Sequence, residues 1–221
     1  MRIKWYGHAS FLIETGGVRI ITDPYDPEVV VGYAPIREPA DIVIRSSDDD
    51  RGHCNAKMIP GNPTVITATE IIDGGITVRG IHFRAVPVLE SVIFKESPLD
   101  NAMYCFEAEG IRITHMGDVG NPLDAEQLEA LEGTDLLLAL TGGPPTIDLD
   151  DLERVIQVIR PKVIIPMHYG VAKVSIKMLD VTAFTNRFPK EQIHSAGKSE
   201  IELTRESLPR MSRLVVLEPA C

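Results

Sequence analysis

The sequence is poor in cysteine and aromatic residues and contains no long hydrophobic run. Its three cysteines, Cys54, Cys105 and Cys221, match neither a Cys-x-x-Cys metal site nor a disulfide framework. Aromatic residues make up 5% of the chain, which argues against a surface that stacks nucleic-acid bases. No run of about 18 apolar residues is present, so no membrane span is predicted. The first residues hold no apolar segment long enough for a signal peptide, and we expect a protein of the reducing cytoplasm.

The charge balance is acidic. A net charge of −10 over 221 residues argues against nucleic acid or an anionic membrane as a partner, because both repel an acidic surface. Hydrophobic residues make up 44% of the chain, which is ordinary for a folded protein with a sizeable core. The length fits one large domain or two small ones, and we expect one domain spanning residues 1–221.

Apolar runs and turn signals predict an α/β protein that begins with strands and continues with strands and helices in alternation. Gly-containing turns predict hairpins at 15–17 and 109–110, and a turn at 73–75 predicts that strands 64–67 and 76–78 pair with each other. Further strands are predicted at residues 10–13, 18–21, 41–44, 81–85, 102–106, 111–114, 135–140, 163–166, 200–203 and 214–217. Helices are predicted at residues 121–131, from Asp148 or Asp150 through 159, and over most of 175–188.

Several of these predicted strands end at a polar residue. The strand-end residues are Asp23, the run from Asp48 to His53, Glu90, Asp118 and His168. Because ligands of open α/β sheets bind at strand ends, we expect these side chains to converge on one edge. Three adjacent carboxylates at 48–50 need a cation, solvent or raised pKa values to lie together. The alternatives are a metal site and an acidic, solvated turn.

Taken together, these motifs resemble the metallo-β-lactamase superfamily, and within it the small metal-dependent hydrolases related to L-ascorbate-6-phosphate lactonase. The resemblance covers nearly the whole chain. It rests on the segments GHASFLIETGGVRIITDP, DIVIRSSDDDRGHCN, VPVLES, EAEGIRITHMGD, LLALTGGPPTID and PKVIIPMHYG. It implies a four-layer αββα sandwich with a metal site at the edge between two mixed sheets, and a small-molecule substrate.

The resemblance also implies a set of site residues, although the first metal motif of the family, His-x-His-x-Asp-His, is altered here. Aligned on His53, its two leading histidines become Asp48 and Asp50, and its aspartate becomes Gly52. A register one residue earlier would use Ser47 and Asp49 but would lose His53. The implied metal ligands are Asp48, Asp50, His53, Glu90, Asp118 and His168, with His8 and Asp23 as supporting residues behind them.

The altered ligand set affects the choice of metal. Carboxylates are hard ligands, so four carboxylates with two imidazoles favour Mn²⁺, Fe²⁺, Mg²⁺ or Ca²⁺ over the usual pair of Zn²⁺ ions. Four negative charges exceed the charge of one divalent ion. They require a second ion, protonated carboxyl groups, or pairing with a cationic side chain, for which the candidates are Arg45, Arg51 and Lys95.

Two functions remain open. In the first, one or two divalent ions activate water for hydrolysis of a lactone, ester or phosphoester, with Asp118 and Asp50 as the catalytic carboxylates. In the second, the altered motif marks a catalytically inactive homologue that acts as a binding or scaffold protein. Gly52 weakens the first reading, and the survival of His53, Asp118 and His168 weakens the second. Assembly of several copies into a homo-oligomer is a third, weaker alternative.

Overall fold

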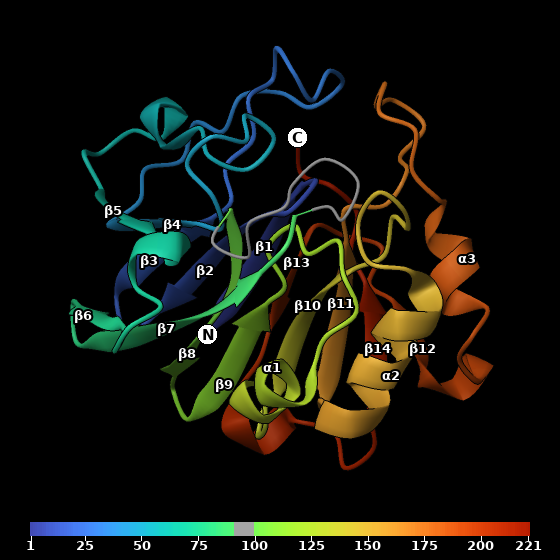
Figure 1. The fold of residues 1–221 in the computed structure, drawn as a ribbon. Coiled ribbons are helices and arrows are strands. Elements are labelled where there is room, and N and C mark those ends of the chain that lie inside the picture. The colour runs from blue at the N-terminus through green and yellow to red at the C-terminus, as the bar shows by residue number, and fades with distance from the viewer. Residues whose placement is uncertain (91–99) are drawn as a thin grey trace.

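Two β-sheets packed face to face form the centre of the protein (Figure 1). The computed structural model describes residues 1–90 and 100–221. The first sheet has the order β13-β1-β2-β3-β4-β5, with β1 (Arg2–Gly7), β2 (Ser10–Thr15), β3 (Val18–Thr22), β4 (Ile42–Arg45), β5 (Thr64–Thr67) and β13 (Glu200–Glu202). The second has the order β12-β14-β11-β10-β9-β8-β7-β6. Its strands are β6 (Ile76–Val78), β7 (Ile81–Val88), β8 (Asn101–Ala108), β9 (Ile111–His115), β10 (Leu136–Leu140), β11 (Val163–Met167), β12 (Ile193–Ser195) and β14 (Arg213–Val216).

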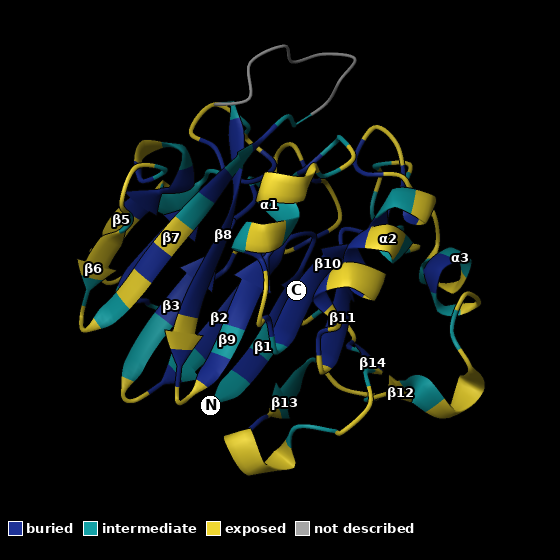
Figure 2. Cartoon of the chain, turned by 60° about the horizontal axis from the view of Figure 1, so that its bottom comes forward, coloured by how far each residue is buried: buried dark blue, intermediate teal, exposed yellow. Residues whose placement is uncertain are grey.

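Helices cover the outer face of the second sheet. They are α1 (Ala125–Ala130), α2 (Leu149–Ile159) and α3 (Val181–Thr185), and Figure 2 shows the buried strands β10 and β11 behind α1 and α2. Every residue of β10 and β11 is buried, as expected for strands covered on both faces. On α2 the buried residues recur at helical spacing, at Leu149, Leu152, Val155, Ile156 and Ile159. The core therefore runs continuously from the space between the sheets to the base of the helices.

The outer face of the first sheet is covered by a loop instead of α-helices. Residues 25–40 and a short 3-10 turn, η1 (Ala56–Met58), lie over it. A second apolar cluster joins this layer to the sheet; it contains Tyr6, Leu12, Ile21, Tyr25, Val30, Tyr33, Ile36, Ala40, Val43 and Ile59. The predicted αββα sandwich class is confirmed, with this one layer built from loop.

Strand direction brings many carboxyl ends to one edge. In the first sheet β3, β4 and β5 are parallel, and in the second β9, β10 and β11 are parallel. Backbone bonds join the sheets at this edge: the His168 N–H donates to the His8 carbonyl at 2.9 Å, and the Ala102 N–H donates to the Ser46 carbonyl at 3.0 Å. The loops that follow these strands are therefore held close together.

Most predicted elements are present, and two differ. Strand β5 does not pair with β6: β5 pairs with β4 in the first sheet, and β6 pairs with β7 in the second. The intervening 3-10 turn η2 (Ala68–Glu70) carries the chain from one sheet to the other, which a local turn signal cannot reveal. The helix predicted over 175–188 is reduced to α3, which begins after the N-cap Asp180.

The remaining differences are smaller. The first helix begins at Ala125, four residues later than predicted, because Asp124 and Gln127 form a capping box there. The strands β1 and β12 were not predicted; the sequence indicated one strand, at 10–13, where β1 and β2 form an antiparallel pair. In the described ranges, no helix combines the length and the apolar character needed to cross a membrane.

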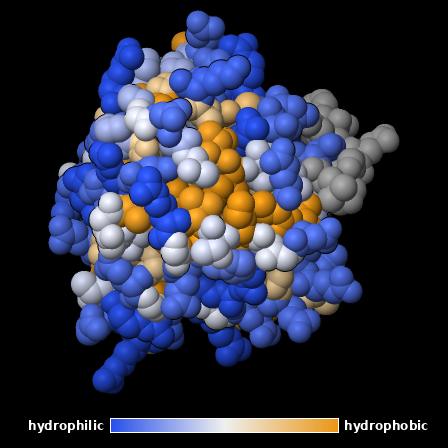
Figure 3. Space-filling model, turned by 90° about the vertical axis from the view of Figure 1, so that its left-hand side faces the viewer, coloured by the Kyte–Doolittle hydropathy of each residue, from blue (hydrophilic) through white to orange (hydrophobic). Residues whose placement is uncertain are grey.

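Hydrophobic side chains gather on the side of the molecule where β5 and β6 end the two sheets (Figure 3). Val65 of β5 is 46% exposed and Ile76 of β6 is 38% exposed. Edge strands expose unpaired backbone groups as well as side chains. This side lies away from the edge where the parallel strands end.

Candidate metal centre

Five segments that follow strands bring ionisable side chains to the common edge of the two sheets. His8 follows β1, Asp23 follows β3 and residues 46–53 follow β4 in the first sheet. Asp118 follows β9, and His168 follows β11 in the second sheet. Residues up to 160 positions apart in the chain thus meet at one place; the strand-end pattern predicted this for Asp23, His53, Asp118 and His168, but it did not include His8.

Two overlapping groups of donors meet there. His8, His53 and His168 form one group, and Asp50, His53 and Asp118 form the other. Within each group the potential ligand atoms all lie within 4.8 Å of one another. Asp118 Oδ1 lies 3.6 Å from His53 Nε2 and 3.5 Å from His168 Nε2. Donors at these separations can surround a single cation.

Each histidine of this cluster has one ring nitrogen that finds no hydrogen-bond partner in the described part of the chain, unlike the buried His115. Across the described residues, His53 Nε2 and Asp118 Oδ1 are buried without a hydrogen bond, and so is Nδ1 of both His8 and His168. His115 is different, because its Nε2 bonds the Ala9 carbonyl and its Nδ1 accepts the Gly117 N–H. Buried polar atoms without partners are rare, and these nitrogen and oxygen atoms are available to bind a cation.

Asp23 holds His53 from behind. Its carboxylate lies 2.8 Å from His53 Nδ1, and it accepts hydrogen bonds from the backbone N–H and the hydroxyl of Ser46 and from the hydroxyl of Tyr104. Asp23 is fully buried. A carboxylate on one ring nitrogen orients a histidine so that its other nitrogen faces a metal. The predicted supporting role of Asp23 thus fits the geometry.

Backbone conformation at the site is unusual. His8, Asp23 and His168 have φ values of 52°, 33° and 58°, in the left-handed region that non-glycine residues seldom adopt. Such residues cluster where function requires them and where surrounding contacts hold them. Gly117, which precedes Asp118, also adopts a left-handed conformation, with φ of 60°. Glycine also avoids a steric clash here, because a Cβ atom at this position would lie 2.8 Å from Asn101 Oδ1.

The imidazoles differ in their affinity for protons. Burial and the charge of His53 lower the pKa of His168 to about 3, and burial with the charges of His168 and His53 holds the pKa of His8 well below its usual range. Burial also acts to lower the pKa of His53, but the charge of Asp118 and the hydrogen bond with Asp23 outweigh it and raise the pKa to about 10. The cluster therefore offers two neutral imidazoles, and the carboxylates around His53 attract positive charge to the centre of the site.

The carboxyl group of Asp118 responds to the same surroundings. Burial raises its pKa to about 7, against the lowering effect of the nearby His53 and with help from the charges of Asp50 and Glu90. A carboxyl group has a pKa near 7 when its neighbours do not fully compensate the negative charge of its ionised form. A cation among these donors would relieve that imbalance.

The remaining predicted ligands are placed as follows. Asp50 is half-buried, and its Oδ2 lies 3.8 Å from His53 Nε2. Asp48 is exposed and belongs to neither donor group. Glu90 is half-buried and belongs to neither group, although its charge acts on Asp118. The sequence did not single out His8 as a donor, although its GHAS motif marked it as a residue near the site.

The arginines and lysines of the described residues do not neutralise the site. Arg51 pairs with Asp26, with Nη2 2.5 Å from Oδ2, and Arg45 Nε donates to the Thr67 hydroxyl. Lys95 lies outside the described residues. Among residues 1–90 and 100–221, no arginine or lysine forms an ion pair with Asp50 or Asp118.

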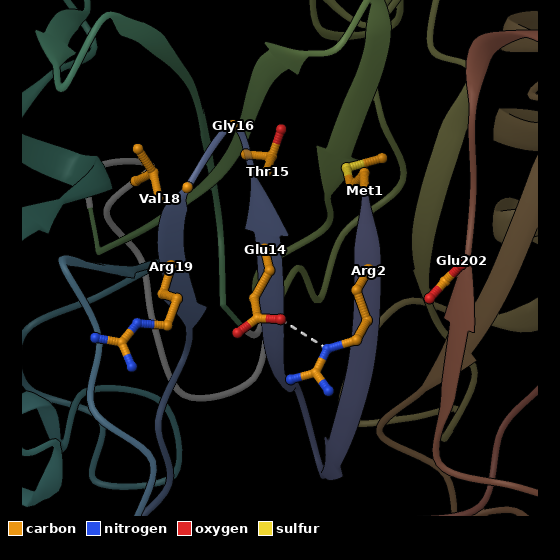
Figure 4. A pocket seen from close by; sticks show the side chains of 9 residues that line it. Met1, Arg2, Glu14, Thr15, Gly16, Val18, Arg19 and Glu202 are labelled. Carbon is orange, nitrogen blue, oxygen red and sulfur yellow. Dashed lines mark ion pairs between the residues drawn. The ribbon is translucent and has the colours of Figure 1, made fainter.

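A separate hollow of about 600 Å³ lies at the opposite ends of β1, β2 and β3 (Figure 4). Its charged side chains include Arg2, Glu14 and Arg19. Arg2 Nε forms an ion pair with Glu14 Oε2 at 2.7 Å. Arg2 and Glu14 therefore compensate each other's charge within this hollow.

Two stacked mixed sheets with a histidine and carboxylate cluster at their common edge define a metallo-β-lactamase-type fold. The sequence profile of the β-lactamase superfamily domain matches residues 2–168, and the chain belongs to this family. The closer likeness to ascorbate lactonases stays a prediction.

Similar proteins include several metal-dependent hydrolases. A UPF0173 metal-dependent hydrolase of Alkaliphilus metalliredigens is 29% identical, over 91% of this chain and 99% of that protein. A crystal structure from Thermotoga maritima, of a protein proposed as a Zn-dependent hydrolase of the metallo-β-lactamase superfamily, is 31% identical. It covers 98% of both chains with a TM-score of 0.78. A metallo hydrolase of Ignicoccus hospitalis, 18% identical, shares the fold with a TM-score of 0.68 over 99% of this chain and 95% of that one.

Proposed function

We propose that the protein is a metal-dependent hydrolase that cleaves a lactone, ester or phosphoester bond of a small molecule. One observation carries this proposal: imidazole and carboxylate groups from both sheets converge, and His53 Nε2 and Asp118 Oδ1 are buried among them with no hydrogen-bond partner in the described residues. Imidazoles suit Zn²⁺ and Fe²⁺ and carboxylates suit Mn²⁺, so the mixed set fits a divalent transition metal. His53, Asp118 and His168 would hold it.

Each residue then has a distinct role. A divalent cation held there would polarise the carbonyl or phosphoryl oxygen of a substrate and acidify a water molecule. Asp23 keeps Nε2 of His53 directed at the cluster. Asp50 reaches solvent, with its side chain 24% exposed, and its Oδ1 accepts the Gly52 N–H at 2.8 Å. Asp50 is therefore placed to take the proton of the attacking water.

Metal content and turnover test the proposal together. Protein purified without added metal should contain about one equivalent of a transition metal by elemental analysis. After treatment with a chelator it should lose activity toward a panel of lactones, carboxylic esters and phosphodiesters, and Mn²⁺, Fe²⁺ or Zn²⁺ should restore it. Protein with almost no metal and no turnover under any of these ions would instead support the binding or scaffold function.

Asp50→Asn should separate proton transfer from metal binding. The amide keeps the shape of the side chain but cannot take a proton, so kcat should fall by about 10²–10⁴-fold with little change in KM. Steady-state kinetics and elemental analysis of the same preparation measure both effects. Asp48→Asn, two residues away and exposed, is the matched control and should behave as wild type. Loss of metal from Asp50→Asn would show that Asp50 is a ligand instead.

A further inference from the structure

We propose that His8 is a direct ligand of the cation and supplies a donor in the space that Gly52 leaves open. This inference rests on the proposed metal site and adds to it a ligand from the end of β1. It changes the donor set from two imidazoles to three.

The first observation is the position of the His8 ring. Its centroid lies 4.0 Å from that of His168 and 4.8 Å from that of His53. The three rings share a group of potential ligand atoms that all lie within 4.8 Å of one another. His8 is only 3% exposed, so its ring belongs to the interior of the cluster. Three buried imidazoles this close together are the arrangement that a transition metal can bridge.

The second observation concerns Gly52. A Cβ atom on residue 52 would lie 3.3 Å from His8 Nε2 and 3.2 Å from Asp50 Oδ1. Any side chain at position 52 would therefore compete for space with these two donors. The resemblance to the family predicts an aspartate at this position, and the glycine removes that donor. His8 and Asp50 border the space that the first atom of such a side chain would occupy.

The third observation is how firmly His8 is held. Its φ of 52° is strained, and its carbonyl accepts hydrogen bonds from Trp5 Nε1 at 3.0 Å and from the His168 N–H at 2.9 Å. The second bond ties the backbone of His8 to the backbone of another proposed ligand. A strained residue persists only where its surroundings fix it, and these bonds fix the backbone of His8 beside that of His168.

A purely supporting role for His8 fits these contacts less well. A supporting residue donates or accepts a hydrogen bond that orients a ligand, as Asp23 does for His53. His8 Nδ1 has no hydrogen-bond partner within the described residues. The described side chains show no hydrogen bond between the His8 ring and His53, His168 or either carboxylate of the cluster.

Metal affinity of variants tests the inference directly. Mn²⁺ binding to the chelator-treated protein can be followed by titration with electron paramagnetic resonance. His8→Ala should bind Mn²⁺ at least ~100-fold more weakly than wild type, and His8→Gln should be similarly weak. His194→Ala, which removes an exposed histidine on β12, is the matched control and should bind as wild type.

A second measurement needs no variant and covers the case in which His8→Ala does not fold. Pulsed electron paramagnetic resonance of wild-type protein with one equivalent of Mn²⁺ counts the imidazole nitrogens coupled to the ion. Three coupled imidazoles support the inference, and two overturn it. His8→Ala that binds Mn²⁺ within a few-fold of wild type also overturns it. Wild-type protein that binds no Mn²⁺, Fe²⁺ or Zn²⁺ would contradict the proposed function itself.

Discussion

An Asp118→Ala variant should retain less than about a thousandth of wild-type turnover and should no longer copurify with metal. Asp118 Oδ1 lies within 3.6 Å of Nε2 of both His53 and His168, and it is buried without a hydrogen bond among the described residues. Its carboxylate is thus the anionic donor at the centre of the cluster. Without it, the imidazoles would have to bind a dication with no buried carboxylate among the donor atoms, and neutral donors alone hold such an ion less tightly.

Elemental analysis and steady-state kinetics on matched preparations measure this effect. Asp73→Ala is a suitable control, because Asp73 is an exposed aspartate in the turn before β6 and should change neither metal content nor turnover. Asp118→Asn adds a finer comparison, since it keeps the shape and one oxygen but loses the charge. Full metal content and wild-type turnover in Asp118→Ala would contradict the proposed metal centre.

The strand-end pattern was enough to bring His53, Asp118 and His168 to one edge, because parallel strands in both sheets end there. It could not distinguish Asp48 from Asp50. Both residues follow β4 within a few positions, and only the path of the loop separates them. That path depends on bonds such as the His53 N–H to the Asp50 carbonyl and the Ser46 N–H to Asp23.

Contacts between distant segments were harder to predict. His8 meets His168 because the ends of β1 and β11 come together across the two sheets, which no local pattern encodes. The same limitation explains the wrong pairing of strands 64–67 and 76–78. A turn signal between two apolar runs predicts a hairpin, but η2 sends these strands to different sheets. Local signals therefore predicted the elements, and tertiary packing decided their partners.

Asp23→Ala should be the most destabilising substitution near the site. The Asp23 carboxylate lies against His53 Nδ1 and accepts hydrogen bonds from Ser46, through both its N–H and its hydroxyl, and from Tyr104. Removing one partner from a buried, hydrogen-bonded charged network costs about 3–5 kcal/mol. For a chain of this size the midpoint of thermal unfolding should fall by about 10 °C. Calorimetry of the metal-free protein measures this change without the contribution of a bound ion.

The same carboxylate gives the protein part of its acid sensitivity. Burial acts to raise the pKa of Asp23, but the charge of His115 and the hydrogen bonds from His53 and Ser46 outweigh it, so the pKa lies below the ordinary 3.8. The stabilisation is present above pH 3.8 and is lost as the pH falls through the lower pKa of the folded state. Between these two pKa values the Asp23 carboxylate binds a proton in the unfolded chain but not in the folded chain. Asp23→Ala should therefore lose stability less steeply below pH 4 than wild type. Ser46→Ala removes one hydroxyl bond to the carboxylate, should cost about 2 kcal/mol and should change the acid profile less than Asp23→Ala does. An Asp23→Ala variant no less stable than Ser46→Ala would show that the network does not anchor His53.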